Sequence, residues 1–94
     1  MSARLLVDVG NTRIKWARLR AGRLGPMRAA AHAGWRVADY RRAVAAALRG
    51  VETVDVVSVA GAAADRLLRR AIREAAGLEP RFVAPTRAAA GVRN

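Results

Sequence analysis

One short polar stretch near the start of the chain combines residue types that can bind a phosphate group. Asp8 lies within an apolar run, where a carboxylate is costly unless it meets a cation or hydrogen-bond donors. Gly10 and Asn11 follow it and favour a turn, since both accept main-chain angles that most residues avoid. A turn with free main-chain N–H groups beside a cation can bind phosphate, and a neighbouring carboxylate can hold Mg²⁺, normally through water. The stretch therefore predicts a phosphate-binding turn with a magnesium-binding carboxylate.

The cations of this stretch come from the strand that follows the turn. If residues 10–11 form a two-residue hairpin loop, Asp8 faces Arg13, and Lys15 lies on the same face of the hairpin. The hydroxyl of Thr12 adds a further hydrogen-bonding group to the turn. Spacing alone leaves a structural alternative open, in which Asp8 pairs with Arg13 and the turn binds nothing.

The charge of the chain is strongly positive, and arginine carries nearly all of it. Lys and Arg total 18 against 7 Asp and Glu, which gives a net charge of +11. Such a balance can indicate a nucleic-acid partner, but arginine spread along an alanine-rich chain also fits a general preference for arginine at surface positions. Lys15 is the only lysine. A lysine retained against that preference indicates a need for a compact, rotatable ammonium group.

Composition excludes several classes of protein. Hydrophobic residues make up 53% of the 94 residues, so the chain is not intrinsically disordered and has the size of one small domain. It has no cysteine and one histidine, His32, which excludes disulfides, thiolate metal sites and cysteine nucleophiles. No apolar run approaches the roughly 20 residues of a membrane span, and no signal peptide is recognisable. We therefore expect a cytoplasmic protein that does not associate with a membrane.

Apolar periodicity and turn residues predict an alternating set of strands and helices. The expected strands cover residues 4–9, 12–19, 27–33, 53–59 and 81–84, and the expected helices cover residues 37–48 and 65–76. The order is β-β-β-α-β-α-β, with antiparallel links at the start and two crossovers that bring later strands parallel to the first. This pattern predicts an α/β fold with a mixed sheet, the ribonuclease H-like half-domain.

Four side chains that could do chemistry are expected to be structural instead. Trp16 alternates toward the core, and Trp35 precedes a helix whose first turn it can staple. His32 lies in an alanine-rich stretch and is expected to be structural or exposed. Ser58 lacks the sharp turn of a nucleophile elbow, so it receives no catalytic role.

A known phosphate motif has the same order of residues as the polar stretch. The motif D-x-G-N-T-x-x-K of type III pantothenate kinases, the family that also includes the Bvg accessory factor, resembles Asp8-Val9-Gly10-Asn11-Thr12-Arg13-Ile14-Lys15. Residues 55–60 resemble the fourth strand of that family, and residues 82–94 resemble the segment that leads into its substrate motif. The resemblance implies the superfamily of acetate and sugar kinases, heat-shock chaperones and actin. The lobes of that superfamily are ribonuclease H-like, in agreement with the predicted order of elements.

The resemblance also implies an activity and a set of ligands. The family phosphorylates pantothenate to 4'-phosphopantothenate with ATP in coenzyme A synthesis. It uses Mg²⁺ and a monovalent cation, potassium or ammonium, and it works as a homodimer. In this chain, residues 8–15 would bind the ATP phosphates. Asp8 would hold Mg²⁺ through water, Gly10, Asn11 and Thr12 would wrap the phosphates, and Lys15 would neutralise them.

The chain departs from the family at its catalytic centre. The G-x-D-R motif, whose Asp is the general base of the family, does not occur in these residues and is expected beyond Asn94. The nearest string, Ala63-Ala64-Asp65-Arg66, lacks the glycine and is interpreted as the start of a helix. We therefore expect a single N-terminal lobe over residues 1–94, without the second lobe. Phosphoryl transfer requires nucleophile, phosphate and metal to be held together, so this chain alone is expected to be inactive.

Two other functions stay open at this stage. A basic DNA-binding or transcription accessory protein without kinase activity would use the charge of +11, although aromatic residues that could stack on bases make up only 4%. A ribonuclease H-type nuclease would need several carboxylates around two metals. Only Asp8 and Asp55 lie near strands in suitable places, so this function ranks last.

Overall fold

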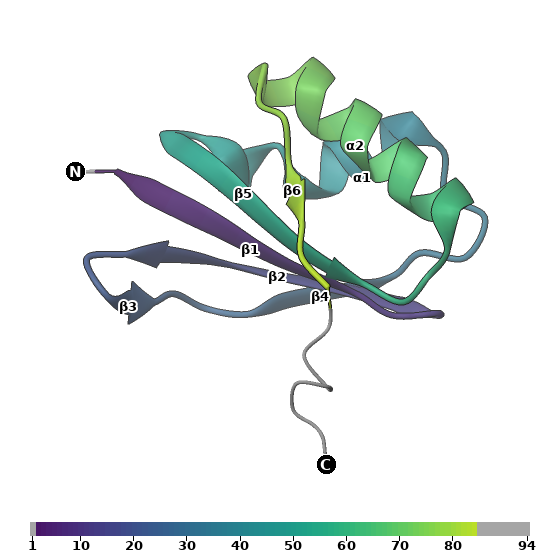
Figure 1. Cartoon of the computed structure of the whole chain (residues 1–94), viewed down its shortest axis with the longest axis horizontal. Coiled ribbons are helices and arrows are strands. Elements are labelled where there is room, and N and C mark those ends of the chain that lie inside the picture. The colour runs from purple at the N-terminus through teal and green to yellow at the C-terminus, as the bar shows by residue number, and fades with distance from the viewer. Residues whose placement is uncertain (1, 85–94) are drawn as a thin grey trace, which may run out of the picture.

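The computed structural model describes residues 2–84, which form one mixed sheet with both α-helices on a single face (Figure 1). In chain order its elements are β1 (Ala3–Val9), β2 (Arg13–Arg20), β3 (Arg23–Leu24), β4 (Arg28–Ala31), α1 (Val37–Val44), a 3-10 helix (Ala46–Leu48), β5 (Val51–Ser58), α2 (Ala62–Ala76) and β6 (Arg81–Phe82). The strand order is β3-β2-β1-β5-β6, and β4 also pairs with β2. β1 runs antiparallel to β2 and parallel to β5, and β5 runs parallel to β6. The predicted α/β fold with a mixed sheet is confirmed.

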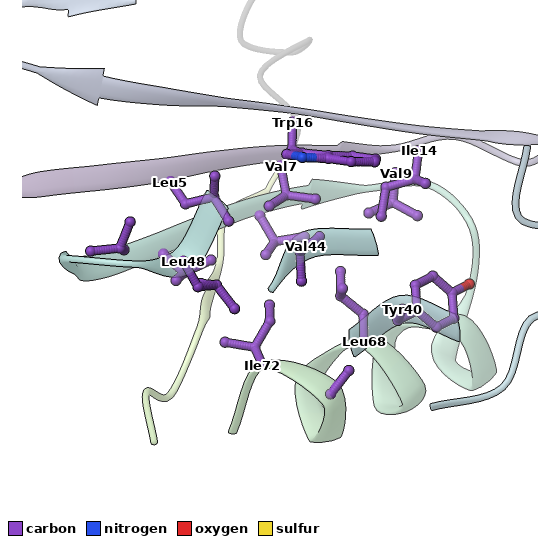
Figure 2. Packing of buried hydrophobic residues seen from close by; sticks show 14 of the residues in the cluster. Leu5, Val7, Val9, Ile14, Trp16, Tyr40, Val44, Leu48, Leu68 and Ile72 are labelled. Atoms are coloured by element: carbon purple, nitrogen blue, oxygen red, sulfur yellow. The ribbon is translucent and has the colours of Figure 1, made fainter. Parts of the chain in front are cut away.

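Strict alternation along β1 separates the two faces of the sheet. Leu5, Val7 and Val9 are buried toward the helices, whereas Arg4 and Asp8 are exposed on the opposite face. Apolar side chains of β2 and β5 continue the buried face. The helices complete the core with the buried residues Tyr40, Val44, Leu68, Ala71 and Ile72, most of which Figure 2 shows beneath the sheet. The opposite face carries the polar residues of the candidate site.

Glycines and one left-handed alanine explain where several elements end. Gly61 (φ 105°) precedes α2, which begins at Ala62, three residues before the prediction, and Gly77 (φ 69°) ends it. Ala21 (φ 52°) and Gly22 (φ 75°) form a tight turn into β3, a strand that the sequence did not predict.

The bounds of three predicted elements differ in the structure. The predicted helix over 37–48 is wrong beyond Val44, because the last turn tightens into the 3-10 helix. The strand predicted at 27–33 is shorter, and the strand predicted at 53–59 begins at Val51.

The hairpin between β1 and β2 turns one residue later than predicted. Val9 pairs with Ile14 and Asp8 pairs with Lys15, so Asp8 does not face Arg13 and that prediction is wrong. The N–H of Gly10 donates to the carbonyl of Arg13 at 2.8 Å, which continues the ladder and leaves residues 11–12 as the loop. Each residue of β1 pairs with a residue two positions later in β2 than predicted. Because side chains alternate between the faces every residue, a shift of two positions leaves them on the same face. The predicted grouping of Asp8, Arg13 and Lys15 on one face therefore survives the error.

None of the helices formed by residues 2–84 combines the length and apolar character that a membrane crossing requires.

Candidate functional site

Three connections of the fold meet at one end of the sheet. The β1–β2 turn, the β4–α1 connection and the β5–α2 connection all lie at this end (Figure 1). The N–H of His32 donates to the carbonyl of Thr12 at 3.1 Å, and the N–H of Val59 donates to the carbonyl of Val9 at 2.9 Å. This is the carboxyl end of the parallel strands β1 and β5, where α/β sheets most often bind ligands.

The predicted phosphate-binding residues fall on both sides of the β1–β2 turn. A shallow cavity of about 200 Å³ on the helix-free face is lined by Asp8, Gly10, Thr12, Arg13 and Lys15. The fold therefore brings these five residues of the predicted stretch together. They form what we call the turn cavity.

The other three residues of the stretch do not line the turn cavity. Val9 and Ile14 are 1% and 0% exposed in the core, so only their main chains could meet a ligand. Asn11 lines a separate cavity of about 220 Å³ on the other side of the turn, together with His32, Trp35 and other residues. For Val9 and Ile14 the predicted phosphate binding therefore concerns the main chain, and for Asn11 it concerns the other side of the turn. Phosphate binding by the eight residues stays a prediction.

The charged side chains of the turn cavity lack partners among residues 2–84. Within that region no ion pair joins Asp8, Arg13 or Lys15 to another charge within 4.0 Å, so the Asp8–Arg13 pair of the structural alternative is absent. Other carboxylates are engaged: Asp55, for example, meets both Arg4 and Arg81. Two cations and one carboxylate leave the turn cavity with a net positive charge, which suits an anionic ligand.

A metal at this site would have one protein carboxylate. No cluster of three or more His, Asp or Glu side chains suited to a metal occurs in the described part of the chain. Residues 2–84 therefore do not bring together the several carboxylates that a two-metal nuclease centre needs, and Asp55 is paired with arginines. A single carboxylate does fit Mg²⁺ bound with phosphates, because Mg²⁺ keeps several waters and often takes only one or two carboxylates.

The main chain of the turn presents N–H donors that no acceptor in the described part of the chain uses. In residues 2–84, the N–H groups of Asn11 and Thr12 have no hydrogen-bond acceptor, whereas the carbonyls of Gly10 and Thr12 are both bonded to His32. Successive free N–H groups in a turn form an anion-binding concavity. A side chain at Gly10 would crowd this turn, since a Cβ there would lie 3.3 Å from the carbonyl oxygen of Arg13.

His32 is the residue of the site that sequence reasoning missed. It is only 5% exposed. Its Nε2 lies 2.8 Å from the carbonyl oxygen of Gly10, and its Nδ1 lies 2.6 Å from the hydroxyl of Tyr40. Burial raises the pKa of Tyr40, and the negative charge of Asp65 adds to that rise. The sequence held a weak signal: a lone histidine after a strand, eight residues before a tyrosine on an amphipathic helix.

Ser58 and Asp65 shape the neighbouring β5–α2 connection. Ser58 Oγ donates to Asp65 Oδ1 at 2.5 Å and accepts from the N–H of Ala60 at 3.2 Å. Asp65 lies in the first turn of α2, so the interpretation of Ala63–Arg66 as a helix start is confirmed. Negative charge is favourable at this end of a helix.

The two tryptophans are structural, as predicted. Trp16 is 8% exposed and belongs to the core. Trp35 lies immediately before the N-cap of α1 and contacts Tyr40 edge-on, with ring centroids 5.1 Å apart. Contact between these two helix positions is the hydrophobic staple.

Several solved structures share this fold at low sequence identity. A Ppx/GppA family member of Aquifex aeolicus matches with a TM-score of 0.54 and 15% identity, over 92% of this chain and 36% of that one. RuvC of T. thermophilus, in complex with Holliday junction substrate, matches with a TM-score of 0.69 and 16% identity, over 93% of this chain and 67% of that one. A Bacteroides thetaiotaomicron protein with an actin-like ATPase fold and unknown function matches with a TM-score of 0.62 and 8% identity, over 87% of this chain and 32% of that one. No curated protein matches the sequence.

These likenesses define the fold class: the chain has a mixed α/β fold of the ribonuclease H-like and actin-like ATPase kind. It spans little more than a third of the Ppx/GppA structure, at 36%. The family model of type III pantothenate kinase matches residues 4–94. The chain belongs to the type III pantothenate kinase family.

Proposed function

We propose that this chain forms the ATP-phosphate-binding lobe of a type III pantothenate kinase. The turn cavity carries the proposal, because it combines a carboxylate, two cations and two turn N–H groups that have no partners among residues 2–84. The phosphates of ATP would accept hydrogen bonds from the N–H groups of Asn11 and Thr12 and would meet the positive charge of Lys15. These preset donors would favour the charge distribution that develops as the γ-phosphoryl group moves to the pantothenate hydroxyl.

We also propose that Asp8 holds Mg²⁺ at the turn cavity through water. When bound, the ion would neutralise part of the phosphate charge. Asp8 lies opposite Lys15 across the hairpin, so a carboxylate and an ammonium group flank the same space. The monovalent cation, potassium or ammonium, and a homodimeric assembly complete the proposal on the basis of family membership.

The catalytic base belongs to a part of the enzyme that we place after Asn94. The G-x-D-R motif of the family would supply an aspartate that takes the proton of the pantothenate hydroxyl. Residues 1–94 would then supply phosphate binding, and a second lobe would supply the remaining walls of the active site. This division predicts that the 94-residue chain binds Mg-ATP without turning it over.

Binding of Mg-ATP to the 94-residue chain tests this function. The amide NMR signals of residues 8–15 are expected to shift on titration, and Lys15→Ala is expected to weaken binding about tenfold or more, as loss of a charge-assisted hydrogen bond would. Arg23→Ala is the matched control. It removes one exposed positive charge from β3, which follows the turn at the other end of β2.

One result would contradict the proposed ATP binding, and another would contradict the predicted inactivity of the chain alone. Equal weakening by Arg23→Ala and Lys15→Ala would mean that only net charge attracts the nucleotide. Turnover of ATP with pantothenate and potassium above the level of Lys15→Ala would refute the prediction that the chain is inactive alone.

A nucleic-acid partner remains the alternative, supported by the net charge of +11. It predicts binding of a DNA duplex that weakens steeply with salt, with a slope set by the number of phosphates contacted. Absence of DNA binding at moderate salt would reject this alternative and leave the kinase proposal in place.

A further inference from the structure

We propose that His32 is a positioning residue that holds the phosphate-binding turn in shape, with Tyr40 fixing the tautomer that His32 needs for this task. The proposal rests on the function proposed above and concerns the same site. It assigns a role to two buried residues that lie outside the D-x-G-N-T-x-x-K stretch.

His32 binds both carbonyls that border the loop of the turn. Its main-chain N–H donates to the carbonyl of Thr12 at 3.1 Å, and its Nε2 lies 2.8 Å from the carbonyl oxygen of Gly10. A carbonyl oxygen that points toward a phosphate would repel it. The Gly10 carbonyl and the Asn11 N–H belong to one planar peptide group, so holding this carbonyl also fixes the direction of an N–H that has no acceptor among residues 2–84.

The hydrogen bonds of His32 define its tautomer. A carbonyl oxygen can only accept, so Nε2 must carry the proton that it donates to Gly10. In the neutral ring, Nδ1 is then an acceptor, and the Tyr40 hydroxyl at 2.6 Å donates to it. Without this donor, the ring could place its proton on Nδ1 and turn a lone pair toward the Gly10 carbonyl. Tyr40 therefore acts on the turn through His32.

Packing fixes the position of both rings. His32 is 5% exposed and Tyr40 is 2% exposed. The His32 ring meets Trp35 and Tyr40 edge-on, with centroids 6.3 Å and 5.8 Å away. Tyr40 is anchored in the core from α1, and Figure 2 shows its hydroxyl at the margin of the cluster. The chain of contacts thus connects the helix layer to the turn.

The first test needs no substitution. The ¹⁵N NMR shifts of the imidazole nitrogens in the 94-residue chain report which nitrogen carries the proton. We expect a protonated Nε2 and an unprotonated Nδ1 in the neutral ring. A proton on Nδ1, or a ring that exchanges between both tautomers, would overturn the proposal whether or not the chain binds nucleotide.

The second test separates positioning from general stability. His32→Phe keeps an aromatic ring but removes both nitrogens, and Tyr40→Phe removes only the hydroxyl. His32→Gln keeps an amide donor at a similar reach. We expect His32→Phe to weaken Mg-ATP binding about tenfold, because the turn loses the hydrogen bond that holds the Gly10 carbonyl. His32→Gln should restore part of the binding. Amide exchange at Gly10 and at position 32, whose N–H groups donate to the carbonyls of Arg13 and Thr12, should accelerate in His32→Phe and Tyr40→Phe.

The outcomes distinguish this proposal from the proposed function. If the unaltered chain binds no Mg-ATP, the kinase function fails, and the tautomer and amide exchange still decide whether His32 holds the turn. If the unaltered chain binds Mg-ATP and folded His32→Phe binds it equally well, the positioning role fails. If His32→Phe does not fold, Tyr40→Phe and the imidazole shifts of the unaltered chain decide the question.

Discussion

Asp8 and Lys15 lie directly opposite each other across the β1–β2 hairpin, yet no ion pair within 4.0 Å joins them in the described region. Both side chains stand on the face of the sheet that no helix covers. Each therefore keeps its charge available to a ligand in the turn cavity. If Asp8 and Lys15 formed an ion pair, each would interact more weakly with a Mg²⁺–phosphate assembly, because its charge would already be compensated.

Gly10→Ala should disturb the turn without unfolding the protein. A Cβ at this position would lie 3.3 Å from the carbonyl oxygen of Arg13, which is tighter than ordinary contact. We expect a loss of about 1 kcal/mol in the free energy of unfolding and weaker Mg-ATP binding. Chemical denaturation and a binding titration measure the two effects.

Gly22→Ala provides the control for that substitution. It places a side chain at a φ of 75° with nothing within 4 Å, so it costs stability through backbone strain at the other end of β2. Mg-ATP binding that falls equally in both variants would show that Gly10 has no special place in the site.

Tyr40 should make the protein sensitive to alkaline pH. Burial, with a contribution from Asp65, raises its folded-state pKa above the ordinary value of 10.0. A raised pKa contributes stability that is fully present below pH 10.0 and is lost as the pH rises through the folded-state pKa. Tyr40 is the only tyrosine, so ultraviolet absorbance of tyrosinate reports its titration directly.

The same pH series on Tyr40→Phe identifies the source of the effect. The part of the alkaline stability loss that comes from Tyr40 should disappear in this variant. A midpoint for tyrosinate formation at or below 10.0 in the folded protein would contradict the prediction.

Ser58→Ala should loosen the connection between β5 and α2. It removes the hydroxyl that donates to Asp65 and accepts from the N–H of Ala60. We expect a loss of about 1–2 kcal/mol in the free energy of unfolding, because two partners lose a hydrogen bond in a half-buried site. Thermal denaturation measures the loss. Ser2 is the other serine of the chain and is exposed, so Ser2→Ala should leave the stability unchanged, and equal losses in both variants would refute the assignment.

Leu68→Ala should be among the most destabilising substitutions in the helix layer. Leu68 is fully buried between α2 and the sheet (Figure 2), and its truncation leaves a cavity that costs roughly 2–5 kcal/mol. Leu24→Ala is the matched control, since Leu24 on β3 is 55% exposed and its truncation should cost less than about 0.5 kcal/mol. Similar denaturant midpoints for both variants would contradict the observed core.

Glu74 should contribute to the loss of stability in acid. Its pKa is lowered below 4.5, chiefly by the hydrogen bond from Arg70 and further by the positive charges of Arg70 and Arg41. A lowered pKa contributes stability that is present above pH 4.5 and is lost as the pH falls through the folded-state pKa. Glu74→Gln should therefore flatten the acid limb of the stability profile. Glu52→Gln is the matched control, because Glu52 has no ion pair in the described region, and an equal change in both variants would refute the role of Glu74.

The order of most elements and the face of the sheet that carries the site follow from local sequence patterns, whereas β3 was not predicted. Alternating apolar residues in β1 and β5 and the apolar stripe of α2 are local patterns with fixed periods, so the mixed sheet could be predicted from them. The alternation also placed Asp8, Arg13 and Lys15 on one face, even though the predicted turn was one residue early. Because side chains alternate between the faces every residue, a register error of two residues leaves each side chain on the same face.

The contacts that hold the turn come from long-range packing, which local sequence patterns do not reveal. His32 and Tyr40 lie 22 and 30 positions after Gly10 in the sequence, and no local pattern connects them with it. The ladder between β2 and β4 brings His32 beside the turn, and the packing of α1 on the sheet brings the Tyr40 hydroxyl to its ring. Hydrogen bonds between such distant residues depend on how whole elements pack, because each atom must reach its partner within a few tenths of an ångström.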